Sequence, residues 1–469
     1  MTTPDQVEDD SVLDALVAFA TQLQDADIPT AAAARLLDHT VDAFGCAIAA
    51  VDEPASIVAR TLAAGSSSDA GASVIGLTHR TAPEFASFAN AAMVRQLDYN
   101  DTYNSKSGGH PSDMIPAFIA AAESTGRNPR AVFRGAYVAY EVFGALCDSA
   151  TLRDRGWDHG AFIAIACAAG LVSVLGLDPA RAANAISLTA TTSVPLRITR
   201  SGSLSEWKGC ATAHSALNAT ILTRLAALGM TGPGRPFTGV DGFLHRVVAP
   251  LDLAGLGRPV DGRSVVERTS LKSLPVEYAA QAPIEMFLGL SRELDADDIE
   301  SITISAHRFL YKEIGGGRDD ARDKWDPQTR ETADHSFPYL TAVALTDHAV
   351  TLDSFRLERV LDPALRPLMN RISIVEPPDA ADLDPTRQPV DATIELRDGT
   401  VIRRSCEFSR GHPSNPASPD EVDAKFRNLA ERVMPSGADD LLAELRALPD
   451  ASGLEGLTGR LRAVPTTSR

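Results

Sequence analysis

The sequence predicts a mainly α protein that carries a second domain of the α+β class. Through roughly the first 265 residues, apolar side chains recur at helical spacing, and Ala and Leu dominate. Beyond that point, apolar and polar residues alternate in short runs that are typical of half-buried strands. We therefore expect a large all-helical domain over 1–265, a smaller α+β domain over 266–424, and C-terminal helices over 425–469 that return to the helical domain.

The helices are predicted from apolar residues that share one face. In residues 11–24 this face is formed by Leu13, Leu16 and Val17, and a second helix begins after Pro29. Further helices are expected over 81–97, 113–125, 129–149, 160–176, 178–191 and 205–229. The gaps between them carry Gly, Pro, Asp or Ser, which interrupt helices.

The strands of the second domain are expected at three places. The runs over 300–306 and 371–376 alternate between apolar and polar residues. Two further runs flank Asp398 and Gly399, a pair that is typical of a two-residue hairpin turn. The Pro-rich stretch 411–419 is expected to form a loop.

Composition argues against several classes of partner. With 469 residues, of which 44% are hydrophobic, the chain can bury an ample core and is expected to be globular. Its net charge of −18 argues against nucleic acid or an anionic membrane surface as a partner, because both would repel it. An anionic ligand would therefore need a local cationic pocket.

The cysteines and the N-terminus indicate a cytoplasmic protein. Five widely spaced cysteines suggest neither a disulfide framework nor a zinc cluster, which fits a reducing compartment. The N-terminus is acidic where a signal peptide would be basic, and no uninterrupted apolar run reaches the ~18 residues that a membrane span needs.

A polar stretch from Leu97 to Met114, LDYNDTYNSKSGGHPSDM, lies between two apolar helical segments. It contains three carboxylates, a lysine, a histidine and the glycine pair Gly108 and Gly109. Such a loop either folds inward to form a site or is a solvated surface connection, and its composition leaves both open.

Three other segments carry polar residues in unusual settings. His159 begins an Ala-rich helix, where it could be a cap, a core residue or part of an anion site. Arg200 and Lys208 lie in a cationic loop before a helix of small residues, which could hold a carboxylate or be solvated. Lys272 lies in what could be simply an interdomain linker.

A fourth segment, Lys324–Leu345, places His335 and Tyr339 before an apolar helix. His335 could be a cap, and Tyr339 could be a core residue with a bonded hydroxyl. No His-x-x-x-His spacing and no cysteine pair occurs, so no metal site is expected.

Together, these motifs resemble the MmgE/PrpD family. They read LDYNDTYNSKSGGHPSD, GWDHG, SLSEWKG, LPVEYAAQ and DPQTRETADHSFPYL, with GMTGPGRPFTGVDGF at 229–243, and they occur in the order of the family over about residues 10–430. The resemblance implies a large helical domain with a smaller α+β lid, a homodimer, and an enzyme that uses neither a metal nor an organic cofactor.

The matching motifs assign site residues one at a time. The acidic site residue of the family falls on Asp98, its threonine on Thr102, and its two histidines on His110 and His159. The glycine pair beside His110 is expected to let the backbone bend so that the imidazole faces the cleft.

The remaining motifs supply the other candidates. The site lysines of the family fall on Lys208 and Lys272, and its tyrosine falls on Tyr339, four residues after His335. One departure is Ala279, which stands where dehydratase-like members usually have a histidine, so a proton donor or a substrate contact of the family is in question here.

The resemblance implies a cofactor-independent lyase that acts on a citrate-like di- or tricarboxylate, first of all by dehydrating 2-methylcitrate or citrate through acid–base catalysis. The expected catalytic groups are His110, His159, Asp98 and Tyr339, with Asp98 orienting His110, and the expected substrate-binding groups are Lys208, Lys272, Thr102, Arg200 and His335. Lys106 is expected to be a solvated charge. The alternatives are decarboxylation of cis-aconitate, epimerisation or isomerisation of a related dicarboxylate, and a non-catalytic tricarboxylate-binding protein.

Overall fold

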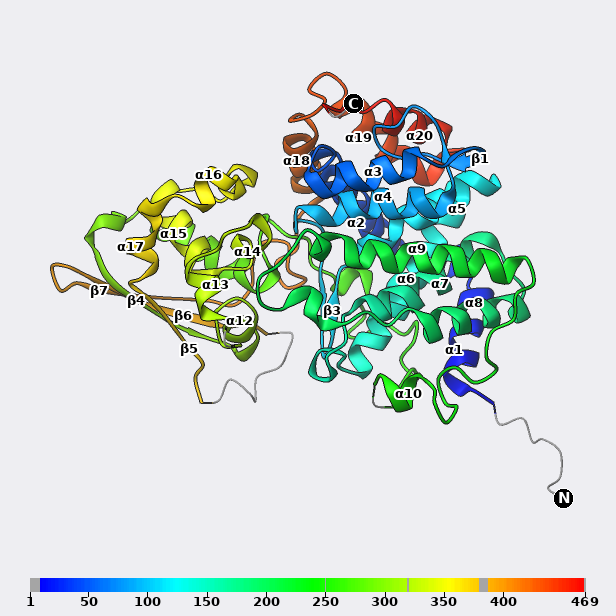
Figure 1. Ribbon diagram of the computed structural model, residues 1–469, viewed down its shortest axis with the longest axis horizontal. Coiled ribbons are helices and arrows are strands. Elements are labelled where there is room, and N and C mark those ends of the chain that lie inside the picture. Colours follow the sequence, from blue (N-terminus) through cyan, green and yellow to red (C-terminus); the bar gives the residue numbers. More distant parts are fainter. Residues whose placement is uncertain (1–8, 249, 319, 379–386, 468–469) are drawn as a thin grey trace.

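The computed structural model describes residues 9–248, 250–318, 320–378 and 387–467, and it confirms a mainly α protein with a small sheet-containing second domain (Figure 1). The larger domain is built from helices α1 (Ser11–Gln22), α2 (Thr30–Ala49), α3 (Pro54–Ala64), α4 (Pro83–Gln96), α5 (Ile115–Thr125), α6 (Pro129–Ser149), α7 (Gly160–Leu175), α8 (Pro179–Thr192), α9 (Trp207–Ala227), α10 (Phe243–Arg246), α18 (Pro419–Ala430), α19 (Ala438–Ala447) and α20 (Glu455–Arg462). It also contains three short strands, β1 (Ser67–Ala72), β2 (Tyr103–Asn104) and β3 (Gly108–Gly109).

The helix ends follow the capping residues of the sequence. Helix α6 begins where the side chain of Asn128 accepts from the N–H of Ala131, and Pro129 occupies the first turn. Helix α7 ends at Gly176, which has a left-handed φ of 65°. The helices predicted over 129–149 and 160–176 are therefore confirmed almost to the residue.

Helix α7 lies in the centre of the larger domain, and every one of its residues except Leu175 is buried. Gly170 of this helix faces Gly135 of α6 so closely that a Cβ on Gly135 would lie 2.7 Å from the carbonyl oxygen of Gly170. The two glycines therefore let α6 and α7 pack at close range.

The lid contains a four-stranded sheet with the order β5-β4-β6-β7. Its strands are β4 (Ile299–Ala306), β5 (Ile372–Val375), β6 (Val390–Leu396) and β7 (Val401–Cys406). Strand β5 is parallel to β4, and the other pairs are antiparallel. All three predicted strand sites are confirmed, including the hairpin at Asp398 and Gly399, where Gly399 has a φ of 87°. The edge strand β7 carries the exposed Arg403 and Arg404, which disfavour pairing with another chain.

Helices of the lid cover the sheet and connect it to the larger domain. They are α11 (Gln281–Leu290), α12 (Arg308–Glu313), α13 (Ala321–Trp325), α14 (Arg330–Ala333), α15 (Phe337–Asp347), α16 (Leu357–Val360) and α17 (Arg366–Met369). Five of these seven helices have only four to six residues, too few for a helical period to show in the sequence. Helix α3, in contrast, is long enough to predict but was not expected.

Two hydrophobic cores divide the chain. The larger core draws on residues up to Leu271 and again from Val422, whereas the core of the lid draws on residues from Val276 to Ile394. Helix α18 returns to the larger domain, where Phe426 packs against Gly45 of α2 at a distance that leaves little space for a Cβ on the glycine.

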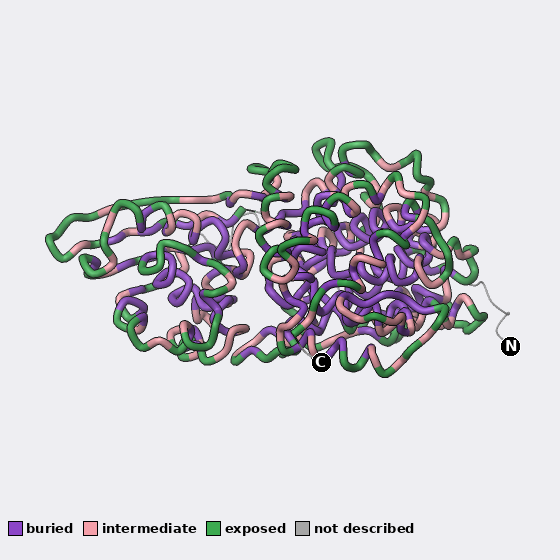
Figure 2. Tube along the Cα trace, turned by 90° about the horizontal axis from the view of Figure 1, so that it is seen from above, coloured by how far each residue is buried: buried purple, intermediate pink, exposed green. Residues whose placement is uncertain are grey.

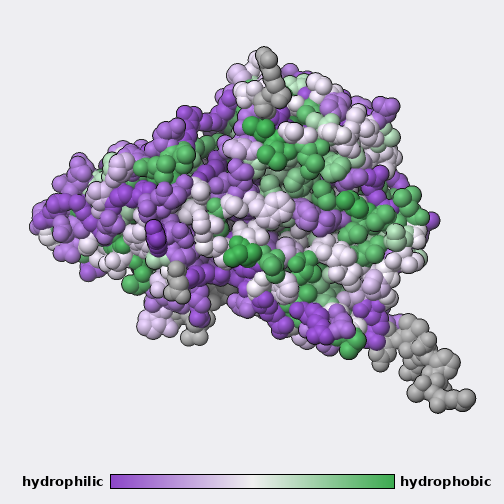
Figure 3. Space-filling model, in the orientation of Figure 1, coloured by the Kyte–Doolittle hydropathy of each residue, from purple (hydrophilic) through white to green (hydrophobic). Residues whose placement is uncertain are grey.

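The two domains also differ in exposure. Figure 2 shows buried segments concentrated in the larger domain, with the lid projecting from it and ending in an exposed hairpin. On the face drawn in Figure 3, apolar side chains gather mainly over the larger domain and the lid is more hydrophilic. No helix in the described part of the chain is long and apolar enough to cross a lipid bilayer. All five cysteines are free thiols, as their spacing predicted.

Gly411 lies where the chain returns from the lid to the larger domain. Its substitution tests whether close backbone packing at this junction contributes to stability. Its φ is +87°, and a Cβ there would lie 1.9 Å from the carbonyl oxygen of Leu271. Gly399 has the same φ, but a Cβ there would meet nothing within 4 Å. We expect Gly399→Ala to lower the free energy of unfolding by about 1 kcal/mol, through backbone strain alone. Gly411→Ala should lower it by about 3 kcal/mol, because the backbone must also move.

Urea unfolding of both variants measures this difference. Equal losses at the two positions would show that the contact between Gly411 and Leu271 does not constrain the junction.

Candidate active site

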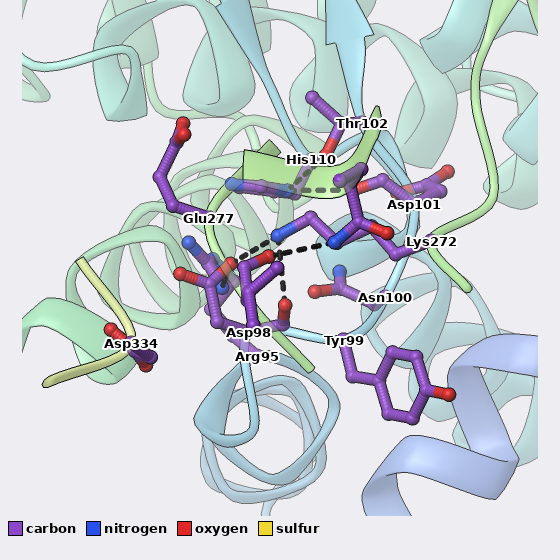
Figure 4. Close-up of polar contacts among 12 residues, drawn as sticks. Arg95, Asp98, Tyr99, Asn100, Asp101, Thr102, His110, Lys272, Glu277 and Asp334 are labelled. Carbon is purple, nitrogen blue, oxygen red and sulfur yellow. Dashed lines mark hydrogen bonds and ion pairs between the residues drawn. The ribbon is translucent and has the colours of Figure 1, made fainter. Parts of the chain in front are cut away.

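A cavity lies between the larger domain and the lid and is lined by most of the predicted site residues. Figure 4 shows four of them, Asp98, Thr102, His110 and Lys272, close together. The residues around the cavity come from the end of α4, the loop 98–110, the segments before α7 and α9, and the lid. They are Arg95, Asp98, Thr102, Asn104, Gly108, Gly109, His110, Arg153, His159, Arg197, Arg200, Lys272, Glu277, Tyr278, Phe309, Glu313 and His335.

Asp98 lies directly after α4 and has a positive φ of 49°, an uncommon conformation for a residue other than glycine. Its Oδ1 accepts from Nη1 of Arg95 at 2.7 Å and from Nζ of Lys272 at 2.5 Å, and Nζ of Lys272 also donates to the Asp98 carbonyl at 2.8 Å. These three contacts over-determine the position of Asp98, which is how a protein maintains a strained backbone at a site.

Lys208 joins Asp98 to the lid. Its Nζ lies 3.1 Å from Oδ2 of Asp98 and 2.7 Å and 2.9 Å from the two carboxylate oxygens of Asp334. The same nitrogen lies 3.1 Å from Nδ1 of His335. One ammonium group therefore links a carboxylate of the larger domain to one of the lid.

The carboxylates of this cluster are ionised. Burial alone would raise the pKa of Asp98, but the charges of Arg95, Lys272 and Lys208 hold that pKa well below its usual value. Burial would likewise raise the pKa of Asp334, and Lys208 lowers that pKa below its usual value.

Asp98, Asp334 and His335 are of the residue types that bind metals, and among the described residues they bring one ligand atom each within 4.8 Å of one another. The ammonium of Lys208 lies among these atoms, at 3.1 Å or less from each residue. A metal ion would have to displace it. We therefore treat this set as a lysine–carboxylate cluster in which the cation is part of the protein.

His110 is oriented by the main chain. Its Nδ1 lies 2.6 Å from the carbonyl oxygen of Asp101 and 3.2 Å from Oγ1 of Thr102. A carbonyl can only accept, so Nδ1 carries the hydrogen and Nε2 is left with a lone pair. The predicted role of Asp98 in orienting His110 is not seen here, because the Asp98 carboxylate contacts cations instead.

Asp101 holds the loop that presents His110. Its Oδ1 accepts from the N–H and the hydroxyl of Ser112 at 3.1 Å and 2.7 Å, and its Oδ2 accepts from the hydroxyl of Tyr140 at 2.6 Å. Nδ1 of His39 lies 3.0 Å from the same Oδ2. All of these groups are buried, so the network fixes the carbonyl that His110 uses.

His159 lies against His110 in an edge-to-face arrangement, with 5.6 Å between the ring centroids. Its Nε2 is buried and has no hydrogen bond among the described residues. A Cβ on Gly109 would lie 2.7 Å from the His159 ring and 2.9 Å from the Phe143 ring.

The glycine pair therefore has a different role from the predicted one. Gly108 and Gly109 do not have positive φ values, and they form the short strand β3 opposite β2. A Cβ on Gly108 would lie 2.8 Å from the carbonyl oxygen of Tyr103. The glycines are needed for close approach, of the neighbouring strand at Gly108 and of the His159 ring at Gly109, and not for a bend.

His335 lines the cavity from the lid side. Its Nδ1 lies 2.6 Å from Oδ1 of Asp334, an acceptor, so Nδ1 carries the hydrogen. Burial and the charge of Lys208 lower the pKa of His335 to about 4, against the opposing effect of Asp334.

The other two histidines are neutral as well. Burial, helped by Arg95 and Lys272, holds the pKa of His110 well below its usual value. Burial, helped by Arg200 and Arg197, does the same for the pKa of His159 against the effect of Asp158. At pH 7 all three imidazoles are unprotonated, which suits a base but not an imidazolium acid.

An arginine cluster forms the remaining wall of the cavity. Nε of Arg200 donates to Asp158 at 2.8 Å, and Nη2 of Arg197 donates to Glu313 at 2.7 Å. Nη2 of Arg200 and Nε of Arg197 are buried without a hydrogen bond. Unsatisfied buried donors are rare in proteins, and a cluster of them beside a cavity favours an anionic ligand.

The structure does not bring all the predicted residues together. Asp98, Thr102, His110, His159, Arg200, Lys272 and His335 line the cavity, and Lys208 supports it through Asp98. Tyr339 does not line the cavity: it is fully buried in the core of the lid, and its hydroxyl donates to the carbonyl of Ser354. Because this bond uses the only donor of the phenol, a catalytic role for Tyr339 is not supported. Lys106 is exposed.

Five charged residues of the cavity were missed from the sequence: Arg95, Arg153, Arg197, Glu277 and Glu313. Arg95 lies three residues before Asp98, a spacing that places both at the same helix end. Glu277 and Tyr278 belong to the LPVEYAAQ motif, from which only the departure at Ala279 was considered in the prediction of the site. Ala279 lies in the core of the lid and does not line the cavity.

The network around Asp101 can be tested at Tyr140. We expect Tyr140→Phe to lower the free energy of unfolding by about 1–3 kcal/mol, because a buried carboxylate oxygen loses a donor. Tyr137 of the same helix is also buried and its hydroxyl makes no hydrogen bond in the described chain, so Tyr137→Phe is the control and should change stability by less than about 0.5 kcal/mol. Denaturant unfolding gives both values. Equal losses of unfolding free energy in the two variants would show that the Asp101 network does not stabilise this loop.

Comparison with known proteins agrees with this site. The MmgE/PrpD N-terminal domain matches residues 14–254, and the MmgE/PrpD C-terminal domain matches residues 274–448. Among curated proteins, the 2-methylcitrate dehydratase of Cupriavidus necator is 30% identical over 437 residues, which cover 86% of this chain and 87% of that protein.

Two other relatives, a dehydratase and a decarboxylase, have lower sequence identity to this chain. The 2-methylcitrate dehydratase of Escherichia coli K12 is 26% identical over 434 residues, covering 86% of this chain and 87% of that protein. The cis-aconitate decarboxylase of Mus musculus is 24% identical over 409 residues, covering 82% and 79%. These similarities support an enzyme of dehydratase type. Since the two family domains together cover most of its length, the chain belongs to the MmgE/PrpD family.

Proposed function

We propose that this protein is a cofactor-independent lyase that removes water from a citrate-like di- or tricarboxylate, with 2-methylcitrate or citrate as the first candidates. The observation that carries the proposal is the cavity itself, in which neutral imidazoles lie beside several buried cations. The names of the relatives support the same reaction.

The cations would bind the carboxylates of the substrate. Arg200 and Arg197 have buried nitrogen atoms free to donate, and Lys272 lines the same cavity next to Asp98. In a site of low dielectric, such contacts strengthen as charge builds up on the substrate carboxylate during loss of the α-proton. They also supply the local cationic pocket that an anionic ligand needs in a chain of net charge −18.

His110 would take the proton from carbon. Its Nδ1–H is bound to the carbonyl of Asp101, so the lone pair of Nε2 is available. The C–H bond breaks towards Nε2, its electron pair forms the carbon–carbon double bond, and the neighbouring C–O bond breaks as the hydroxyl leaves with a proton. His159, next to His110, would bind the substrate through Nε2, and Thr102 and His335 would complete the pocket.

Decarboxylation of cis-aconitate is the other reaction among the relatives. Incubation with 2-methylcitrate, citrate and cis-aconitate separates the two. Dehydration forms a conjugated alkene, seen in the ultraviolet, whereas decarboxylation releases carbon dioxide. The proposal expects the alkene without carbon dioxide.

We also propose that the protein acts as a homodimer. Val58 and Leu62 on α3 are 67% and 52% exposed, and apolar side chains gather over the larger domain (Figure 3). Light scattering in solution measures the oligomeric state. A location in the cytoplasm stays a prediction.

Removal of the base or of the central cation should abolish most of the activity. We expect His110→Ala and Lys208→Ala each to lower kcat by about 100-fold or more, since a positioned base contributes at least that much and Lys208 supports Asp98. Lys106→Ala is the control, because Lys106 is exposed and outside the cavity, and it should change kcat less than twofold. Initial rates on the true substrate measure all three. Turnover within a few-fold of wild type in either site variant would contradict the assignment.

Chelation tests the absence of a metal from the reaction. Because the ammonium of Lys208 lies among Asp98, Asp334 and His335, we expect a strong chelator to leave the rate unchanged after exhaustive dialysis. Loss of activity that iron or zinc restores would overturn this expectation.

A further inference from the structure

Dehydration needs an acid as well as a base, and the histidines of the cavity do not supply it. The pKa values of His110, His159 and His335 all lie below the usual value, so none of them is an imidazolium at neutral pH. The phenol of Tyr339 is bonded within the lid. The proton that turns the leaving hydroxyl into water must come from another group of the cavity.

Glu277 is placed to hold such a proton. It lies at the edge of the lid, immediately before the single turn η6 (Tyr278–Ala280), and it lines the cavity together with His110 (Figure 4). Its Oε2 accepts from the N–H of Ala279 at 2.6 Å, and its own N–H donates to the carbonyl of Asp334 at 3.1 Å. Both ends of the residue are thereby fixed, and Oε1 is left without a protein hydrogen bond in the described chain.

Glu277 differs from the other carboxylates of the cavity. Asp98 is bound by Arg95, Lys272 and Lys208, and Glu313 is bound by Arg197. These cations keep both groups ionised. Glu277, in contrast, makes no ion pair within 4 Å in the part of the chain that the structure describes.

The surroundings of Glu277 favour its protonated form. The charged groups that face it are Lys272 at the domain junction, Asp98 after α4, Glu313 of α12 and Arg153. Burial raises the pKa of Glu277 to about 7, with Asp98 and Glu313 adding to the effect of burial and Lys272 opposing it.

We propose that Glu277 is the general acid of the reaction and donates its carboxyl proton to the hydroxyl that leaves the substrate. This role rests on the proposed dehydratase function. As His110 takes the proton from carbon, the electron pair of that C–H bond forms the double bond. The pair of the breaking C–O bond goes to oxygen, which receives the Glu277 proton and departs as water. Glu277 is left as a carboxylate and is reprotonated before the next turnover.

The assignment also accounts for Ala279. In this chain the side chain of residue 279 is buried in the lid core and does not reach the cavity. Glu277, two residues earlier, lines the cavity. The backbone N–H of residue 279, not its side chain, contributes here, by holding Oε2 of Glu277. The proton donor therefore does not depend on the residue that departs from the family motif.

Glu277→Gln tests the role with little change of shape, because the amide oxygen can still accept from Ala279. We expect kcat to fall by about 100-fold or more with KM within threefold of wild type. The pH profile of kcat/KM gives a second readout. An acid must be protonated, so the wild type should lose activity as the pH rises through about 7, and this alkaline decline should be absent from the residual activity of the variant.

Glu285→Gln is the matched control. Glu285 lies in α11, accepts from Ser273 and from the N–H of Arg410, and does not line the cavity. Its variant should keep kcat within threefold and retain the alkaline decline. Glu277→Asp should recover part of the lost rate, because it restores the carboxyl proton.

Three outcomes would overturn the role. Turnover of Glu277→Gln within threefold of wild type would exclude it while leaving the proposed function intact, and so would an alkaline decline that persists in the variant. If the wild type formed no alkene from 2-methylcitrate or citrate, the proposed function would be overturned, and the acid role of Glu277 with it.

Discussion

The contact between Lys208 and the carboxylates of Asp98 and Asp334 is the interaction on which the site depends. Asp98 follows the end of α4, Lys208 lies in the first turn of α9, and Asp334 belongs to the lid. All three side chains are buried, so each would carry a large desolvation penalty if it lost its partners. The cluster therefore specifies how the lid lies on the larger domain, and it does so through charges that are unfavourable in any other arrangement.

Lys425 extends this constraint to the backbone. Its Nζ donates to the carbonyls of Tyr99 and Lys272 at 2.7 Å and 2.8 Å, and it pairs with Asp42 at 2.6 Å. It thus connects α18, at the C-terminal end of the chain, to both segments that bear the Asp98–Lys272 contact. This explains why a helix so far along the sequence contributes to the site, although it supplies no side chain to the cavity.

Helical period and strand alternation were enough to predict the class of the fold and most long elements, because those patterns report which face is buried. The site was predicted less completely, for reasons that particular residues make clear. Tyr339 was assigned because it follows the ADHS motif of the family, but it lies in the first turn of α15 and packs into the lid core. Arg95 and Arg153 lie in segments where a charge normally faces water. Only the fold shows that both enter a cavity, because the contacts that hold them come from residues far along the chain.

In the proposed reaction, the electrostatics of the cavity would serve substrate binding and proton transfer together. Arg95 and Lys272, which would attract an anionic substrate, also lower the pKa of His110 and so would keep this proposed base unprotonated in the empty site. A bound tricarboxylate brings negative charge to the same place, which raises the pKa of a nearby imidazole. His110 would therefore become a stronger base when the substrate is present, and its proton affinity would be coupled to the occupancy of the site. The orientation of His110 by the neutral carbonyl of Asp101 would leave Nε2 free for this change.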